Sequence, residues 1–105
     1  MTLVDILNEM KEKGIGGAVV SIDGTVVEST IALDEVSAGL LSSITNISDA
    51  IMRREGDKQK EIEVSFGDAF LVMVPLDDHI FCGIIKSREE KSAVLEYAQK
   101  AKSLV

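Results

Sequence analysis

Three β-type runs in the second half of the chain, joined by very short connections, limit its possible folds more than any other feature. Residues 60–66 alternate between polar and apolar side chains, residues 69–76 are apolar throughout, and residues 79–86 form the third run. Only residues 67–68 and 77–78 separate these runs. Two-residue connections join antiparallel neighbours, so this region predicts a three-stranded meander. We expect the alternating run at a sheet edge and the apolar run inside the sheet, covered on both faces.

The first half of the chain predicts a helix followed by a hairpin. Apolar residues recur at helical spacing over residues 2–13, which open with the Thr-x-x-Asp pattern of a capping box. Residues 15–22 and 25–31 are two apolar, β-branched runs joined by Asp-Gly at 23–24. An Asp-Gly pair between such runs is the strongest short-range hairpin signal, and it predicts a turn in which both residues have positive φ.

Two further helices complete the predicted order. Residues 33–54 gather apolar side chains on one arc when successive residues are placed about 100° apart. The members of this main stripe, which we expect in the core, are Leu33, Val36, Leu40, Ile44, Ile47, Ala50 and Ile51. Ser87 with Glu90 forms a second capping-box pattern and opens a last helix. The stripe of that helix is Val94, Leu95, Ala98, Ala101 and Leu104.

The sequence therefore predicts an α/β (α+β) fold in the order α-β-β-α-β-β-β-α. Its centre is a five-stranded antiparallel sheet flanked by helices, in two or three layers. With 105 residues, we expect a single domain, 1–105, that folds without disulfides or a metal. Hydrophobic residues make up 46% and charged residues 28%, which is typical of a globular protein.

Composition also predicts the location of the protein and argues against nucleic acid and membranes as partners. The 18 acidic residues outnumber the 11 Lys and Arg, and the net charge of −7 argues against nucleic acid as a partner. No apolar run approaches the roughly 18 residues of a membrane span, and the start lacks the basic segment of a signal peptide. The single cysteine excludes an internal disulfide. We therefore expect a cytoplasmic protein that does not insert into membranes.

Few residues have the pattern of a catalytic or ligand site. The glycine-rich residues 14–17 follow a helix and precede a strand, whereas a phosphate loop needs the reverse order, so we expect a cap and close packing. His79 lies beside Asp77 and Asp78, which leaves a metal or hydrolase site open but is more typical of a solvated turn. Cys82 lies in an apolar run and is expected in the core. We expect no enzyme activity, no metal and no cofactor.

Two features instead indicate association. Residues 60–66 would leave backbone groups unpaired at a sheet edge, and Lys60, Glu61 and Glu63 protect that edge only in part. Glu61 and Glu63 share one strand face, a geometry open to two-carboxylate chemistry but more typical of a soluble surface. Beside the main stripe of residues 33–54 lies a shoulder that suits close contact between helices. Its members are Ser37, Leu41, Ser48 and Met52. Alternatively, the shoulder only widens the core stripe.

Over nearly its whole length the chain resembles the Roadblock family, the roadblock/dynein light chain domain. The most specific part is residues 17–29, GAVVSIDGTVVES, which look like the family's first hairpin with its Asp-Gly turn. Residues 70–76 and 81–85 look like its fourth and fifth strands. Without any appended extension, the chain resembles the minimal single-domain prokaryotic members. Profilin-like, longin and PAS-like domains share related folds, and the expected class is Roadblock/profilin-like.

The resemblance implies a homodimer, or a heterodimer with a Roadblock paralogue. Family members pair their third strands edge to edge, while their long second helices pack against each other. Carried over to this chain, the expected dimer interface is Ser37, Leu41, Ser48, Met52, Lys60, Glu61, Ile62, Glu63, Val64, Ser65 and Phe66.

The resemblance also implies a function, because the family mainly regulates and scaffolds small Ras-like GTPases. We therefore expect a non-enzymatic dimeric regulator or scaffold, as some bacterial relatives stimulate GTP hydrolysis. Arg53 and Arg54 are candidate arginine fingers, although complementarity to the helix dipole explains them equally well. Two alternatives remain open. One is a PAS-like sensor that binds a small apolar ligand, lined by Phe70, Met73 and Phe81, and the other is a hydrolase that uses His79 and Asp77.

Overall fold

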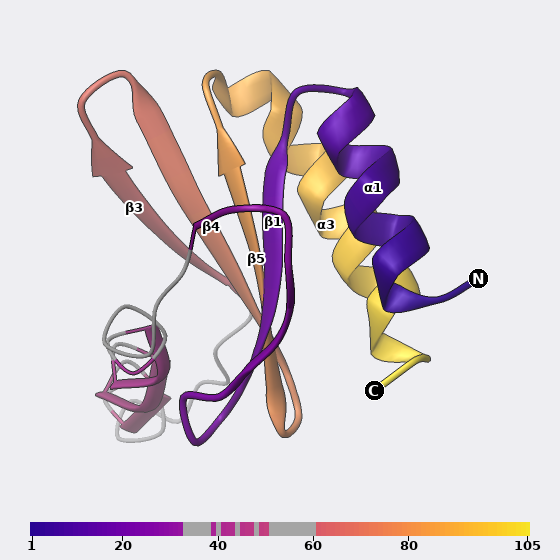
Figure 1. Cartoon of the computed structure of the whole chain (residues 1–105). Helices are drawn as coiled ribbons and strands as arrows, with labels where there is room; N and C mark the ends of the chain where they lie inside the picture. Colours follow the sequence, from indigo (N-terminus) through magenta and orange to yellow (C-terminus); the bar gives the residue numbers. More distant parts are fainter. Residues whose placement is uncertain (33–38, 40, 44, 48, 51–60) are drawn as a thin grey trace.

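The chain folds into helices on both sides of a single sheet (Figure 1). The computed structural model describes residues 1–32, 39, 41–43, 45–47, 49–50 and 61–105. In chain order its elements are α1 (Leu3–Glu12), β1 (Gly16–Ser21), β2 (Val26–Ser29), β3 (Ile62–Phe66), β4 (Ala69–Leu76), β5 (His79–Ile85), the 3-10 helix η1 (Arg88–Glu90) and α3 (Lys91–Lys102). The described residues between 39 and 50 are helical, and we refer to them as the 39–50 helical residues.

The five strands form one antiparallel sheet in the order β2-β1-β5-β4-β3. This confirms the predicted sheet and places the alternating run, as β3, at an edge. The apolar run forms β4, which has a neighbour on each side and is buried on both faces at Val72 and Met73. The middle strand of the sheet is β5. Among the residues that the structure describes, no helix is long and apolar enough to span a membrane.

The sheet has a helix layer on each face, so the fold has three layers (Figure 1). On one face, which we call the helix-pair face, α1 and α3 lie side by side and pack on the strands. Its buried residues include Phe81, Ile6, Leu7, Met10, Val72 and Val94. The other face, which we call the opposite face, lies toward the 39–50 helical residues. Its buried residues are Ala18, Val20, Leu41, Met73, Ile80 and Cys82.

The two outer helices begin as predicted, but one residue predicted to be buried in the last helix is exposed. At α1, the Thr2 hydroxyl accepts from the Asp5 N–H and the Asp5 carboxylate accepts from the Thr2 N–H, which confirms the capping box. The second capping box, Ser87 with Glu90, opens η1, and α3 continues from it. Leu104 is 41% exposed, so its predicted place in the stripe of α3 is wrong.

Tyr97, which was not in the predicted stripe, is buried and connects α3 to α1. Its hydroxyl donates to Glu9 Oε1 at 3.3 Å, and its ring lies between the ammonium groups of Lys13 and Lys100, at 5.2 and 5.4 Å. Tyr97 has helical spacing with Val94, Ala98 and Ala101, so the sequence carried a signal for its burial. Its hydrogen-bond partner, on another helix, could not be read from that spacing.

The turn of the first hairpin differs from the expected one. Gly24 has φ +95°, but Asp77 is the one described non-glycine residue with positive φ, so the prediction for Asp23 is wrong. The Gly24 N–H donates to the Ser21 carbonyl, and the Ser21 N–H donates to the Thr25 carbonyl. This is a three-residue loop, in which a tight turn is followed by one left-handed glycine that restores the twist of the strands.

Two described members of the stripe predicted for residues 33–54 are not buried. Ile47 is 63% exposed and Ala50 is also exposed, so the prediction that they face the core is wrong. The other members of that stripe lie outside the described residues. Buried in their place are Leu41, Ser42 and Thr45.

Burial of Ser42 and Thr45 is permitted because each hydroxyl has a backbone acceptor. Ser42 Oγ donates to the carbonyl of Ile22 in the first hairpin, and Thr45 Oγ1 donates to the carbonyl of Leu41 at 2.9 Å. The packed face of this helical region is thus partly polar, which an apolar-periodicity argument cannot detect.

Candidate partner interface

The two edges of the sheet differ in their regularity. Among the described residues β3 pairs with β4 alone, and the register runs without interruption from Ile62 to Phe66. At the other edge, β2 has four residues, and its register with β1 shifts between Val19 and Val20. Short, irregular edges resist pairing with another chain, whereas a regular edge presents an ordered row of unpaired backbone groups. Strand β3 is therefore the edge that is suited to accept another strand.

Alternate side chains of β3 point to different faces of the sheet. Ile62 and Val64 are partly buried against the cluster of the opposite face. Glu63 lies across from Val72 of β4, which belongs to the helix-pair face. Ser65, on the same face as Glu63, is exposed. The edge thus has an apolar side and a polar side.

The polar side of this edge carries four charged side chains, which we call the β3 ion cluster: Glu61, Glu63, Arg88 and Lys91. Lys91 Nζ lies 2.9 Å from Glu61 Oε2 and 3.2 Å from Glu63 Oε2. Arg88 Nε lies 3.4 Å from the buried Glu63 Oε1, a distance too long for a good hydrogen bond. Hydrogen bonds to the two carboxylates raise the pKa of Lys91, so its ammonium group stays charged at neutral pH.

Sequence reasoning did not detect the cations of this cluster. Lys91 and Glu63 are 28 residues apart, and their contact depends on α3 packing beside the sheet. Arg88 also lies over the ring of Phe70, with its guanidinium carbon 5.3 Å from the ring centre. Because the carboxylates of Glu61 and Glu63 are ion-paired, their arrangement supports a structural role rather than acid-base chemistry.

The predicted interface residues fall into two groups. Ser37, Ser48, Met52 and Lys60 lie outside the described residues, as do Arg53 and Arg54 and the side chain of Phe66. The structure brings together Glu61, Ile62, Glu63, Val64 and Ser65 at one edge.

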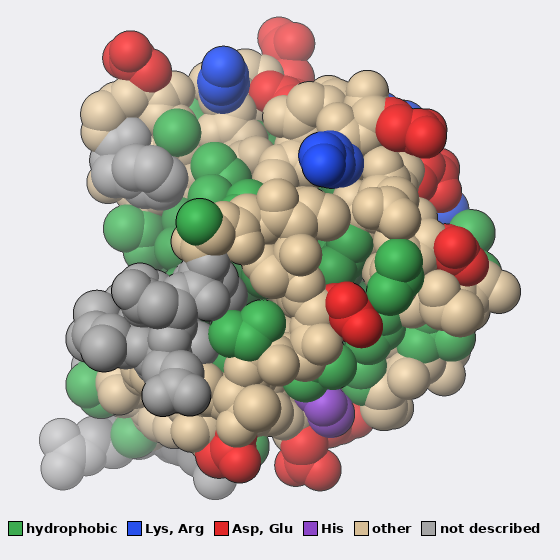
Figure 2. Space-filling view, in the orientation of Figure 1, with side chains coloured by type: hydrophobic (Ala, Val, Ile, Leu, Met, Phe, Trp, Pro, Cys, Tyr) green, Lys and Arg blue, Asp and Glu red, His purple; other side chains and the backbone are tan. Residues whose placement is uncertain are grey.

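Leu41, the remaining predicted member, is 8% exposed and belongs to the opposite-face cluster, a position that agrees with the alternative in which the shoulder widens the core. The exposed apolar residue of the 39–50 helical residues is Ile47, which sequence reasoning placed in the core. In the space-filling view, hydrophobic side chains gather on the side of the molecule where β3 and β4 lie (Figure 2). Ile47 is therefore a further candidate contact for a partner because its own side chain is exposed.

The other candidate sites have structural explanations. Gly14 has φ +80° just after α1, and a Cβ at Gly17 would lie 2.9 Å from Leu7 and 3.0 Å from Met10, so these glycines serve a helix end and close packing. Cys82 is fully buried, and burial raises the pKa of its thiol to about 12. His79 is the first residue of β5, opposite Leu76, and no group of three metal-ligating side chains occurs among the described residues.

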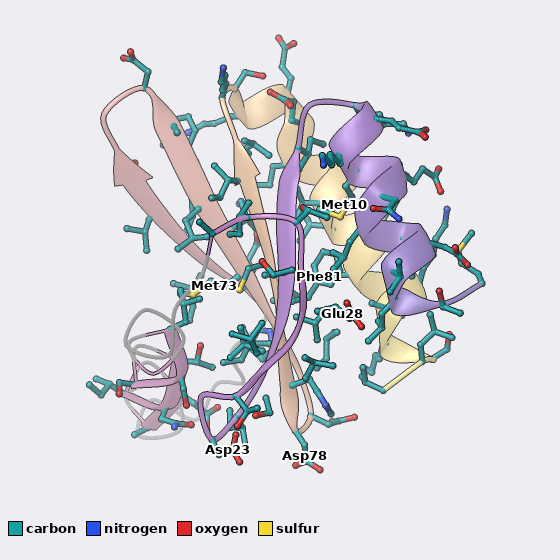
Figure 3. The ribbon with its side chains drawn as sticks, in the orientation of Figure 1. Met10, Asp23, Glu28, Met73, Asp78 and Phe81 are labelled. Atoms are coloured by element: carbon teal, nitrogen blue, oxygen red, sulfur yellow. The ribbon has the colours of Figure 1, made fainter. Side chains whose placement is uncertain are left out.

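The three residues expected to line a PAS-like pocket do not share one site. Phe81 is fully buried on the helix-pair face, and Phe70 packs against the same cluster. Met73 is fully buried on the opposite face (Figure 3). The sheet separates them, so the proposed lining is wrong.

Comparisons with known proteins agree with this geometry at the level of the fold. No family model matches the sequence, and no curated protein is significantly similar to it. The Roadblock/LC7 domain from Streptomyces avermitilis superimposes with a TM-score of 0.78 at 14% identity, over 98% of this chain and 93% of that one. The gliding protein MglB from Thermus thermophilus gives 0.76 at 15% identity, over 95% of this chain and 82% of that one.

A more distant likeness connects the chain to profilins. Profilin II from Acanthamoeba castellanii has a TM-score of 0.62 at 15% identity, over 84% of each chain. All three likenesses are at 14–15% identity and show the fold alone. The chain therefore has the fold of the Roadblock/LC7 domain.

Proposed function

We propose that this protein is a dimeric regulator or scaffold that binds a small Ras-like GTPase in the cytoplasm, with residues 1–105 acting as one domain. The observation that carries the proposal is the regular edge strand β3, which pairs with β4 alone among the described residues, in a Roadblock fold. The protein itself is not an enzyme in this proposal. It acts only through what it binds.

Pairing of β3 with the β3 of a second copy, or of a Roadblock paralogue, would continue the sheet across both chains. Each strand would satisfy the outward N–H and C=O groups of the other. Ile62 and Val64, partly buried in one copy, would gain a second apolar neighbour on the opposite face. Ile47 is a large hydrophobic side chain that is 63% exposed, and it supports a helix contact that accompanies the strand pairing.

A regulator of this kind works by differential binding. It stabilises one conformation of the switch segments of the GTPase, and the shift in population follows from the difference in affinity for the two conformations. An arginine finger from Arg53 or Arg54 stays a prediction. The structural neighbours include the gliding protein MglB. The proposal that this chain binds a GTPase comes from its resemblance to Roadblock proteins.

The first experiment tests the dimer by light scattering at low micromolar concentration. Val64→Lys introduces a charge beside the β3 edge and should give a monomer, because a buried unpaired ammonium group opposes strand pairing. Val27→Lys is the matched control, since Val27 lies on the other edge strand and is 41% exposed. It should leave the mass unchanged. A monomeric wild-type protein, or equal loss of dimer in both variants, would contradict the proposed interface.

The second experiment tests the GTPase. Each small Ras-like GTPase of the source organism is loaded with GDP or with a non-hydrolysable GTP analogue, and binding and hydrolysis are measured with and without this protein. We expect a complex with one nucleotide state of one GTPase, and a changed rate of hydrolysis or exchange if the protein is a regulator rather than a scaffold. The absence of any complex and any rate change would reject the GTPase as partner.

A further inference from the structure

We propose that Lys91 is the residue that permits two copies of β3 to pair, because it neutralises carboxylates that the pairing brings together. This inference rests on the dimer proposed above and adds a specificity determinant to it. The starting observation is that one ammonium group binds two carboxylates of the same edge strand, Lys91 Nζ to Glu61 at 2.9 Å and to Glu63 at 3.2 Å.

Strand geometry determines which side chains meet when two copies of β3 pair. Two identical antiparallel edge strands related by a two-fold axis keep their faces, so side chains of the helix-pair face meet the same side chains of the second copy. Glu63 is on that face, opposite Val72 of β4. Glu61 lies two residues earlier and reaches the same lysine. A β3–β3 pair therefore places four carboxylates on one face. Directly opposite side chains in such a pair have Cβ atoms about 5 Å apart, and like charges there are destabilising.

The main cation that neutralises these carboxylates is Lys91. Lys91 is the first residue of α3, which packs on β4 and β5 and carries the lysine to β3. Its side chain is 28% exposed, and those of Glu61 and Glu63 are 33% and 22% exposed, so the three groups shield one another from water. Arg88 contacts Glu63 alone at 3.4 Å, and its side chain is 73% exposed. Lys91 is thus the main neutralising group.

The net charge of the β3 ion cluster indicates which partner the edge fits. The four side chains of the β3 ion cluster carry two negative and two positive charges, so the cluster is neutral although the whole chain has a charge of −7. An isologous interface brings each group against a copy of the same surface, and a locally neutral cluster can meet itself without net repulsion. A second copy of this chain is therefore the occupant that the edge fits. A strand that carries the same acids without a lysine would be disfavoured.

The test measures the dimer dissociation constant by sedimentation at low and high salt. Lys91→Met should raise the Kd about tenfold at low salt, from uncompensated repulsion between carboxylates of the two copies. High salt should remove most of this difference, because it screens charges at a partly exposed seam. Lys102→Met is the matched control. It removes the same charge from the other end of α3 and should behave like the wild type.

A rescue variant separates charge from folding. Lys91→Met combined with Glu61→Gln and Glu63→Gln removes the cation together with its carboxylates, and it should return the Kd to within about twofold of the wild type at both salt concentrations. Circular dichroism confirms that each variant is folded. If Lys91→Met alone unfolds, the triple variant still decides, since a folded triple variant with a weak dimer would overturn the proposal.

The remaining outcomes separate this inference from the proposed function. A wild-type dimer with an unchanged Kd in Lys91→Met would overturn the role of Lys91 and leave the dimer standing. A wild-type protein that stays monomeric would overturn both. Equal effects of Lys91→Met and Lys102→Met would assign the change to net charge rather than to the β3 ion cluster, and this too would overturn the inference.

Discussion

The described side chains on the two faces of the sheet are buried to different degrees. On the helix-pair face, α1, α3 and the strands share thirteen buried residues in one cluster, with four partly buried hydrophobic residues around it. Among the residues that the structure describes, the cluster of the opposite face has six buried residues and six partly buried hydrophobic ones, Ile62 and Val64 of β3 among them. Most of the described apolar side chains in the helix-pair cluster are therefore buried, whereas half of those in the opposite-face cluster keep some exposed surface. A difference of this kind separates residues that hold the fold from residues that meet a partner.

The largest effect is expected at the centre of the helix-pair face. Phe81→Ala removes a fully buried ring from the helix-pair face and should lower the free energy of unfolding by about 3–5 kcal/mol. The loss should not depend on protein concentration, since the ring packs within one chain. Urea denaturation at two protein concentrations measures it. A loss that appears only at high concentration would mean that this face also belongs to an interface.

Close packing at Gly83 tests the same face more finely. A Cβ at this position would lie 2.8 Å from Cγ1 and Cγ2 of Val94 in α3, so Gly83→Ala should cost about 1–3 kcal/mol. The matched control is Gly17→Ala, whose Cβ meets the flexible ends of Leu7 and Met10, which can move away at a smaller cost. Adding Val94→Ala to Gly83→Ala should recover part of the loss. A full loss in the double variant would exclude the clash with Val94 as its cause.

The thiol of Cys82 tests whether water is excluded from the buried centre of the opposite face. Burial raises its pKa to about 12 from an ordinary 9.0. A raised pKa contributes stability below pH 9 that is lost as pH rises from about 9 toward 12, because the unfolded chain gains the ionised thiolate first. At pH 10 this loss is about 1 kcal/mol.

The measurement is the stability of the wild type and of Cys82→Ala between pH 8 and 10. The wild type should lose more stability over this interval than the variant. Identical pH profiles would show that water reaches the thiol in the native state, and that the opposite face is open at its centre.

The smallest effect on folding, and the sharpest contrast with Phe81, is expected at Ile47. This side chain is 63% exposed, so Ile47→Glu should change the stability of the isolated chain by no more than about 0.5 kcal/mol. The same variant should weaken the dimer, because a carboxylate replaces an apolar contact. Light scattering and urea denaturation of one sample separate the two effects. A large loss of stability with an unchanged mass would place Ile47 in the fold rather than at the interface.

Much of the fold could be predicted because its signals are local. The capping boxes of Thr2 with Asp5 and of Ser87 with Glu90 depend on residues three apart, and both are present. Two-residue connections at 67–68 and 77–78 dictated antiparallel pairing, and alternation over 62–66 placed that strand at an edge. For such features, neighbouring residues supply both partners of the interaction, so spacing is enough.

The candidate site was predicted only in part. The edge position of β3 was predicted, whereas Ile47 was expected in the core and is exposed. The role of Leu41 at an interface stays a prediction. The signal that was missed is the pair of hydroxyls at Ser42 and Thr45, which can be buried once a carbonyl accepts their hydrogen bonds. One of those carbonyls belongs to Ile22, twenty residues earlier in the chain.

The sequence by itself determined the order of the described elements, the starts of the outer helices and the edge position of β3, because hydrophobic period, cap and turn residues act over a few positions. Only the tertiary structure decided which side of the 39–50 helical residues is buried, that Tyr97 joins α1 to α3, and that Lys91 binds Glu61 and Glu63. These contacts join residues distant in the sequence. Their energies exist only after the sheet and its helices have packed, and no local pattern contains them.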